Sequence, residues 1–212
     1  MARLTPGLYS PRPERGYPMK LAAFLLLAAA AVSADEAKKA PSPEEQAIME
    51  KYMKAAAPGP EHQKMAKMAG KWKLKVTSWM APGAPPQQSE GTAEYRTIMG
   101  GRFLEEEVHG TMGSDQPFEG RGIDGYDNVT KEHFGTWIDN MGTSAMMMRG
   151  KCAGEGKKCT MKGKMADPIA GKEVPVSSIM TVKDDNNFTW EMHSPGPDGK
   201  PFKSLQIDYT RQ

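Results

Sequence analysis

From Trp72 onward, apolar and polar residues alternate with a period of two, and runs of this kind recur to the C-terminus. In the first run Trp72, Leu74 and Val76 alternate with lysines. Such alternation is typical of a strand with one buried face. The runs lie at approximately 71–80, 88–98, 102–111, 117–126, 131–139, 143–152, 159–166, 173–183, 187–194 and 203–211. The chain is therefore predicted to be mainly β, with about ten strands.

The segments between the runs are short and rich in turn residues, among them Pro82-Gly83, Asp127-Asn128 and Pro197-Asp198-Gly199. Connections this short join antiparallel neighbours, because a parallel pair needs a crossover of about a dozen residues. Ten such strands in an open sheet would leave two unpaired edges, and closure removes both. We therefore predict an antiparallel up-and-down, lipocalin-like barrel, with a two-sheet sandwich as the alternative. Glycines inside the runs are interpreted as bends or bulges of a curved sheet.

An apolar stretch lies upstream of the barrel. Residues 21–34 carry no charge, follow Lys20 and end in the small residues Ser33 and Ala34. As a helix, these 14 residues would rise about 21 Å, short of a hydrocarbon core of about 30 Å. The stretch is typical of an export signal, and translation starting at Met19 would shorten the leader. We expect a periplasmic or secreted protein.

Removing residues 1–34 leaves 24 basic and 25 acidic residues. Charge then gives no reason to expect a nucleic-acid partner. The remaining 178 residues suffice for one domain with a full core, and no membrane span is expected after signal removal. We expect a signal region at 1–34, a helical lead-in at 35–64 and a β-barrel domain at 65–212.

Two short helices are predicted before the barrel. Ser42-Pro43-Glu44-Glu45 is a capping box with proline at the first helical position, so a helix should run from there to about Ala57. A second helix is expected near 61–69, ending at Gly70. The first helix has an apolar face suited to the barrel or to a partner, formed by Ile48, Met49, Tyr52 and Met53.

Cys152 and Cys159 are the two cysteines of the chain, and they flank a six-residue segment typical of a hairpin turn. In an oxidising compartment this arrangement predicts a cross-strand disulfide. A redox pair and a pair of metal thiolates are the alternatives, although the spacing fits neither a C-x-x-C motif nor a zinc knuckle.

Three consecutive glutamates, 105–107, must alternate between the two faces of their strand. If Phe103 faces the lumen, the first and third glutamates face it too, together with His109. If Leu104 and Val108 face the lumen, those groups are solvated. We favour the second arrangement, because a solvated carboxylate avoids a desolvation penalty.

Methionine is frequent, with 15 of the 17 residues outside the leader. Met146 and Met148 can share a face of their strand, while Met147 must point to the other. Thioethers either fill an apolar pocket or hold Cu(I). The four histidines lie far apart, so a metal or haem site would require them to converge from different strands. No catalytic motif is recognised.

Several segments, taken in order, resemble bacterial proteins of the domain of unknown function 1579 family. They are Gly70-Lys71-Trp72, Gly100-Gly101-Arg102-Phe103-Leu104, Pro117-Phe118-Glu119-Gly120, Gly125-Tyr126-Asp127-Asn128, Gly135-Thr136-Trp137-Ile138-Asp139-Asn140-Met141 and Pro197-Asp198-Gly199-Lys200. The resemblance runs from about Met65 to Arg211 and implies a calycin-type barrel without a known activity. Similar barrels include fatty-acid carriers and haem-binding nitrobindins, for which His193 would be the nearest counterpart of the haem ligand.

Together these observations favour an exported barrel that binds a small apolar or amphipathic molecule, more a binding protein than an enzyme. The ligand and any cofactor are unspecified; haem and copper are alternatives, as is a helix that docks on a partner. An enzyme would instead place polar groups such as Glu107, Arg121 and Asp139 in the lumen and shift carboxyl pKa values there. The expected ligand-binding residues are Trp72, Tyr95, Tyr126, Trp137, Met146, Met148 and Trp190.

Overall fold

The computed structural model describes residues 40–112 and 116–212. The expected signal region at 1–34 lies outside the described residues. Lys51–Gln212 forms one compact unit, which holds the whole sheet.

Helix α1 (Pro43–Ala56) begins at the predicted capping box. The Glu45 amide donates to the Ser42 hydroxyl over 3.3 Å, and the Ser42 amide donates to the Glu45 carboxylate over 2.7 Å. The apolar residues of its predicted face are exposed, Tyr52 at 72% and Met53 at 65%. Docking of this face on a partner stays a prediction.

Helix α2 (Pro60–Ala66) follows after Pro58-Gly59. The Gly59 amide donates to Nδ1 of His62, which satisfies a backbone group at the helix start and holds the imidazole in a buried position. The helix packs against β3 and β4, and the chain enters the first strand four residues after the helix ends.

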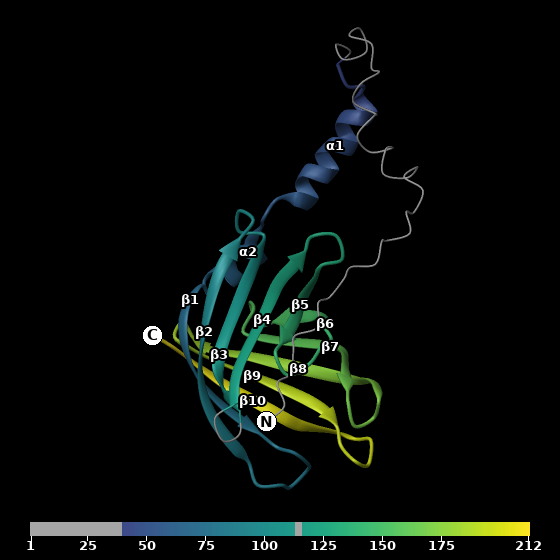
Figure 1. Cartoon of the computed structure of the whole chain (residues 1–212). Coiled ribbons are helices and arrows are strands. Elements are labelled where there is room, and N and C mark those ends of the chain that lie inside the picture. Colours follow the sequence, from purple (N-terminus) through teal and green to yellow (C-terminus); the bar gives the residue numbers. More distant parts are fainter. Residues whose placement is uncertain (1–39, 113–115) are drawn as a thin grey trace, which may run out of the picture. The chain divides into compact units, whose positions relative to one another are not determined.

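Ten strands then form one closed antiparallel barrel in which each strand pairs with its sequence neighbours (Figure 1). They are β1 (Gly70–Ser78), β2 (Gln87–Ile98), β3 (Phe103–Met112), β4 (Gln116–Asp127), β5 (Glu132–Asp139), β6 (Met146–Ala153), β7 (Lys158–Asp167), β8 (Lys172–Asp184), β9 (Asn187–Pro195) and β10 (Pro201–Arg211). The up-and-down barrel is confirmed, and the sandwich alternative is wrong. Closure comes from β1 and β10, which pair from Trp72 opposite Arg211 to Ser78 opposite Leu205.

Aspartates hold several of the hairpin turns. Oδ1 of Asp127 accepts from the Val129 amide, and Oδ1 of Asp184 accepts from the Asn186 amide. Asp198 does the same for the Lys200 amide, with Gly199 at φ +75°. These Asx interactions explain why the predicted turn residues end one strand and start the next.

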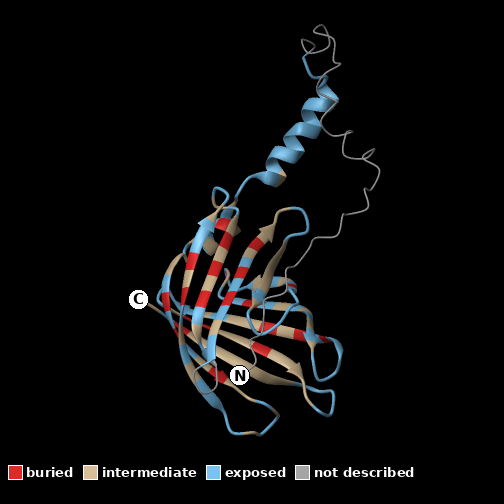
Figure 2. Ribbon diagram, viewed as in Figure 1, coloured by how far each residue is buried: buried red, intermediate tan, exposed pale blue. Residues whose placement is uncertain are grey.

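Alternation along the strands sets the two faces of the barrel (Figure 2). On β3, Leu104, Glu106 and Val108 are buried, at 1%, 7% and 6% exposure, while His109 is exposed. The favoured arrangement with Leu104 and Val108 inside is therefore confirmed. The same alternation places Glu106, the middle of the three glutamates, in the interior.

The interpretation of the strand glycines as bulges is wrong for β2 to β7, where the register runs without a shift. Gly120 and Gly122 instead make room for a large neighbour. A Cβ atom at Gly120 would overlap the Trp137 ring, and one at Gly122 would lie 3.2 Å from it. The glycines thus let the indole lie flat on β4.

Candidate functional site

One part of the barrel interior is a buried cluster of large side chains. Trp72, Tyr95, Phe188 and Tyr209 are each 5% exposed or less, and the rings of Phe188 and Tyr209 stack with centroids 4.1 Å apart. The Trp72 indole donates to the Met68 carbonyl, and the Arg211 guanidinium lies 4.2 Å above the same ring. This cluster draws its residues from β1, β2, β3, β9 and β10, while Val76 and Ile207, further along the inner face of β1 and β10, stay partly exposed.

The rest of the interior is less covered. Trp137, Met180 and Trp190 pack against the edge of the first cluster but keep part of their surface exposed. A second cluster, around Met148, Val174 and Val176, is flanked by further methionines that are also partly exposed. Large apolar groups on the inner face of β5 to β9 are thus incompletely buried.

Glu106 is the carboxyl group of the packed side. The Tyr209 hydroxyl donates to its Oε1 over 3.1 Å, and Tyr95 lies on the neighbouring strand directly opposite. Burial raises the pKa of Glu106 to about 8, with Asp124 adding to the shift and the two tyrosine hydroxyls opposing it. The carboxyl group is therefore largely protonated at neutral pH. The pKa values of Tyr95 and Tyr209 are raised well above their usual range, mainly by burial.

Asp124 is the second interior carboxyl group. It lies diagonally from Glu106, because Gly122 pairs with Glu106 and Leu104 pairs with Asp124. Its carboxyl oxygen rests over Gly135, where a Cβ atom would approach it to 2.7 Å. Burial raises the pKa of Asp124 to about 7. Within residues 40–112 and 116–212 its side chain has neither a hydrogen bond nor an ion pair, although it is partly exposed.

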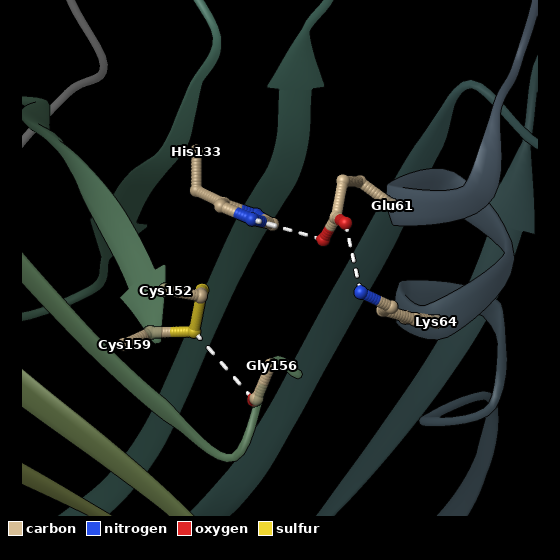
Figure 3. The surroundings of a disulfide bond; sticks show 6 residues. All are labelled: Glu61, Lys64, His133, Cys152, Gly156 and Cys159. Carbon is tan, nitrogen blue, oxygen red and sulfur yellow. Dashed lines mark hydrogen bonds and ion pairs between the residues drawn. A yellow bond between two sulfur atoms is a disulfide. The ribbon is translucent and has the colours of Figure 1, made fainter. Parts of the chain in front are cut away.

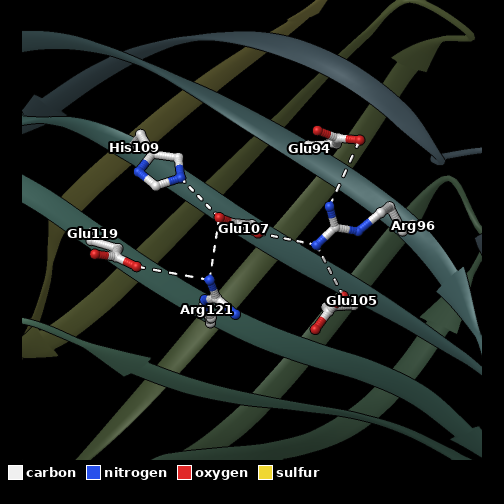
Figure 4. A network of polar contacts seen from close by, with 7 residues as sticks. All are labelled: Glu94, Arg96, Glu105, Glu107, His109, Glu119 and Arg121. Carbon is white, nitrogen blue, oxygen red and sulfur yellow. Dashed lines mark hydrogen bonds and ion pairs between the residues drawn. The ribbon is translucent and has the colours of Figure 1, made fainter.

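The neighbouring charged groups lie outside the barrel. Arg96 contacts Glu105 at 3.2 Å and Glu107 at 3.0 Å, and Glu107 also contacts His109 and Arg121 (Figure 4). This network lies on the outer face of β2, β3 and β4. The placement of Glu107 and Arg121 in the lumen is therefore wrong. Asp139 is inward, and its Oδ2 accepts from the Trp137 indole over 2.9 Å.

A pocket of about 300 Å³ opens at the α2 end of the barrel, where Tyr126, His133 and the disulfide meet residues of α2. Nε2 of His133 lies 3.7 Å from Glu61, which also pairs with Lys64 (Figure 3). Burial lowers the pKa of His133, with the Glu61 carboxylate opposing the shift. The Cys152–Cys159 disulfide is present, and its two residues pair directly across β6 and β7.

The structure separates the seven expected ligand-binding residues into three groups. Trp72 and Tyr95 belong to the packed cluster. Tyr126 lies at the α2 end, against the rings of His62 and His133. The remaining four line the less covered side: Trp137, Met146, Met148 and Trp190. Their role in binding stays a prediction.

His193 does not fit the haem expectation. It pairs with Ser177 on β8, one residue from the buried pair Ser178 and Met192, so it points to the outer face of the sheet. A histidine so placed is not directed at a group in the lumen.

Two interior features were missed by sequence reasoning. Glu106 and Asp124 were not recognised, although the alternation that places Leu104 and Val108 inside also places Glu106 there. Ser178 was not considered; it is 1% exposed, and its hydroxyl has no partner among the described residues. The signal that would have indicated it is its place as the one polar residue among the alternate positions Val174, Val176, Ser178 and Met180.

The fold and its interior define a closed antiparallel β-barrel with a partly covered, methionine-rich and tryptophan-rich lumen. The family model described as "Protein of unknown function (DUF1579)" matches residues 57–211, and the chain belongs to this family. The search for curated relatives yields no match. In the described residues, no helix is long and apolar enough to cross a membrane.

Several solved structures are similar to the chain. The crystal structure of Rv2717c from M. tuberculosis has a TM-score of 0.56 and 14% identity, covering 74% of this chain and 99% of that one. The structure of EF1p2_mFAP2b bound to DFHBI has a TM-score of 0.40 and 14% identity, covering 71% and 98%. The first likeness shows the barrel fold alone, and the second carries no argument about this chain's ligand.

Proposed function

We propose that the barrel binds a small apolar or amphipathic molecule in its lumen. One observation carries the proposal: Trp137, Met146 and Trp190 face the interior yet remain partly exposed, beside a core cluster around Trp72 and Tyr209 that is buried. Full burial of a large apolar side chain contributes about 1.5–3 kcal/mol, and a side chain that stays partly exposed forgoes part of this energy. A ligand that covers this wall would recover part of that energy, and mostly apolar walls with few polar groups are typical of small-molecule sites.

Asp124 is the polar group that would orient such a ligand. It is inward, partly exposed and without a partner in the described chain. A carboxyl group that no protein group engages is free to bond to a polar atom of the ligand. The ligand therefore combines an apolar body with at least one polar atom.

The test is binding of the neutral fluorescent probe N-phenyl-1-naphthylamine. Trp137→Ala should weaken binding about tenfold or more, which corresponds to about 1.4 kcal/mol of lost contact. Ile138→Ala is the matched control, because Ile138 is the next residue and is 54% exposed. Thermal unfolding of both variants separates affinity from stability. Equal affinity of the two variants, or no probe binding by the unmodified protein, contradicts the proposal.

Native mass spectrometry of protein isolated from its own host without denaturation would identify the cargo. A stoichiometric extra mass is the expected result. It should vanish after extraction with organic solvent and return on readdition of the extract.

We also propose that the protein is exported, which the apolar stretch at 21–34 supports. Cleavage after Ala34 would give an N-terminus at Asp35. N-terminal sequencing of periplasmic and cytoplasmic fractions tests this. A cytoplasmic protein that retains its leader contradicts it.

A second candidate function is acid–base catalysis on the bound molecule. The observation that favours it is the pair of interior carboxyl groups with raised pKa values, about 8 for Glu106 and about 7 for Asp124. Groups that titrate near neutral pH can take up and return a proton. The test is deuterium exchange at the α-carbon of a small enolisable ketone, followed by NMR. The unmodified protein should accelerate exchange, and Asp124→Asn should not. If the unmodified protein exchanges the ketone no faster than Asp124→Asn does, the catalytic proposal is contradicted.

A further inference from the structure

The lumen face of the hairpin formed by β6 and β7 consists of sulfur-containing residues and glycine, apart from Asp167 at the end of β7. On β6 the inward positions from Met146 to Cys152 read Met, Met, Gly, Cys. On β7 the inward positions from Cys159 to Met165 read Cys, Met, Gly, Met. The outward positions of the same strands carry mainly lysine, arginine and threonine. Sulfur is therefore confined to one face of this hairpin, except for Met147.

The register brings four of these thioether side chains together. Met148 lies opposite Gly163, and Met161 lies opposite Gly150. Diagonal neighbours on one face of a sheet are within reach of long side chains, so Met148 is adjacent to both Met161 and Met165. The two glycines have no side chain to separate the thioethers, and a Cβ atom at Gly163 would lie 3.0 Å from Met148 Cγ. We call Met146, Met148, Met161 and Met165 the methionine quartet.

The quartet is continuous and open to the lumen. Met148 is 3% exposed, and the other three pack around it while keeping part of their surface exposed. Three of the four side chains thus keep surface that is not covered by the protein. The two cysteines on this face are joined in the disulfide, so they supply no thiolate.

Packing alone does not account for this composition. The packed side of the barrel is built from residues with few rotamers, such as Trp72, Leu74 and Val108. Methionine has three rotatable bonds, so four methionines together define the packing of a core poorly. Thioether sulfur is also a soft ligand, and soft ligands select Cu(I) over harder divalent ions.

Harder metals lack a comparable site. No group of three or more His, Cys, Asp and Glu side chains suited to a metal ion occurs in residues 40–112 and 116–212. Neutral thioethers bind a monovalent ion without a proton being released, so Cu(I) would bind as Cu(I), with no change of oxidation state.

We propose that the methionine quartet is a Cu(I) site on the lumen face of β6 and β7. The inference goes beyond the proposed carrier function. It shares Met146 with that wall, but it rests on the thioethers of β6 and β7 rather than on Asp124, Trp137 or Trp190.

The test is competition for Cu(I) with bicinchoninate under ascorbate and without thiols, so that the disulfide stays intact. The protein should bind one Cu(I) with a dissociation constant below about 1 μM. Two double variants, Met146→Leu with Met148→Leu and Met161→Leu with Met165→Leu, should each bind at least about tenfold more weakly. Leucine is close to methionine in volume, so the fold should survive, and thermal unfolding checks this.

Met147→Leu is the matched control, because it removes a thioether from the same tripeptide but from the outer face, where Met147 is 47% exposed. It should leave the Cu(I) affinity unchanged. A Cys152→Ser, Cys159→Ser variant should also keep the site. Loss of binding in either control, or binding weaker than about 1 μM by the unmodified protein, overturns the proposal.

Methionine methyl NMR gives a second readout that does not depend on affinity. With ¹³C-methyl methionine, Ag(I), a redox-stable analogue of Cu(I), should shift the four quartet resonances and leave that of Met147 in place. Shifts spread over surface methionines such as Met80, 75% exposed, would show unspecific binding and overturn the proposal.

Discussion

The Tyr209 hydroxyl donates a hydrogen bond of 3.1 Å to Oε1 of Glu106, so the last strand of the barrel is joined to the third through the interior. Both residues are buried, at 5% and 7% exposure. The bond gives a partner to a carboxyl group that would otherwise be costly to bury. It does not offset burial fully, because the pKa of Glu106 remains at about 8.

Glu106→Gln should therefore change how stability depends on pH. The pKa is about 4.5 in the unfolded chain and about 8 in the folded protein. Below about pH 4.5 the group is protonated in both states; as pH rises, the unfolded state ionises first, so the free energy of unfolding falls until about pH 8. Glutamine cannot ionise, so this decline should be absent from the variant. Urea unfolding from acid to mildly alkaline pH measures it, and parallel curves for the two proteins would contradict it.

The adjacent Glu107 should behave in the opposite way. His109 and Arg96, followed by Arg121, hold the pKa of Glu107 below its usual range. Its contribution to stability is therefore present above the pKa of the unfolded chain and is lost as pH falls through the folded pKa. Glu107→Gln should be destabilising near neutral pH and neutral in acid. The effect should be small and should shrink in high salt, because the network is exposed. A salt-independent loss at neutral pH would argue against this assignment.

The contrast between these two glutamates shows how far sequence reasoning reached. Alternation correctly assigned the faces of β3, because one buried face with period two is a local property. It could not identify Tyr209 as the partner of Glu106, because that contact depends on how the barrel closes, and the two residues are 103 positions apart.

The methionine quartet was also only partly predicted from the sequence, although in this case the missing contacts are local. The sequence predicted that Met146 and Met148 share a face, but not that Met161 and Met165 join them. The information was nevertheless local. Once Cys152 is placed opposite Cys159, the register of the hairpin follows, and Gly163 must lie opposite Met148. The disulfide prediction could therefore have located the quartet.

The disulfide itself should stabilise the barrel. Cys152 and Cys159 are seven positions apart and close one hairpin. On the chain-entropy model, closing a loop this short contributes about 2.5 kcal/mol, chiefly by restricting the unfolded chain. The Cys152→Ser, Cys159→Ser variant should lose about that free energy of unfolding, as should the unmodified protein under reducing conditions. Chemical denaturation with and without reductant measures both. A reductant effect that persists in the variant would mean that the loss has another cause.

Gly120→Ala should disturb the lumen wall through Trp137. The Trp137 ring lies against Gly120 so closely that an added methyl group would overlap ring carbon Cζ2. The ring is also stacked on Phe118, the neighbouring inward residue of β4, with centroids 6.5 Å apart, and its nitrogen bonds to Asp139. It therefore cannot move away freely, and overpacking of this kind costs about 1–3 kcal/mol.

Gly142→Ala is the control for this prediction, because a Cβ atom at Gly142 would meet nothing within 4 Å and its backbone is not in the left-handed region. We expect Gly120→Ala to lower the denaturation midpoint and to alter the near-UV circular dichroism of the indole, while Gly142→Ala leaves both close to the unmodified protein. Since Trp137 lines the proposed ligand site, Gly120→Ala should also weaken probe binding. Equal stability of the two variants would mean that the indole is not held against β4. Trp137 would then not be a fixed part of the wall that is proposed to bind the ligand.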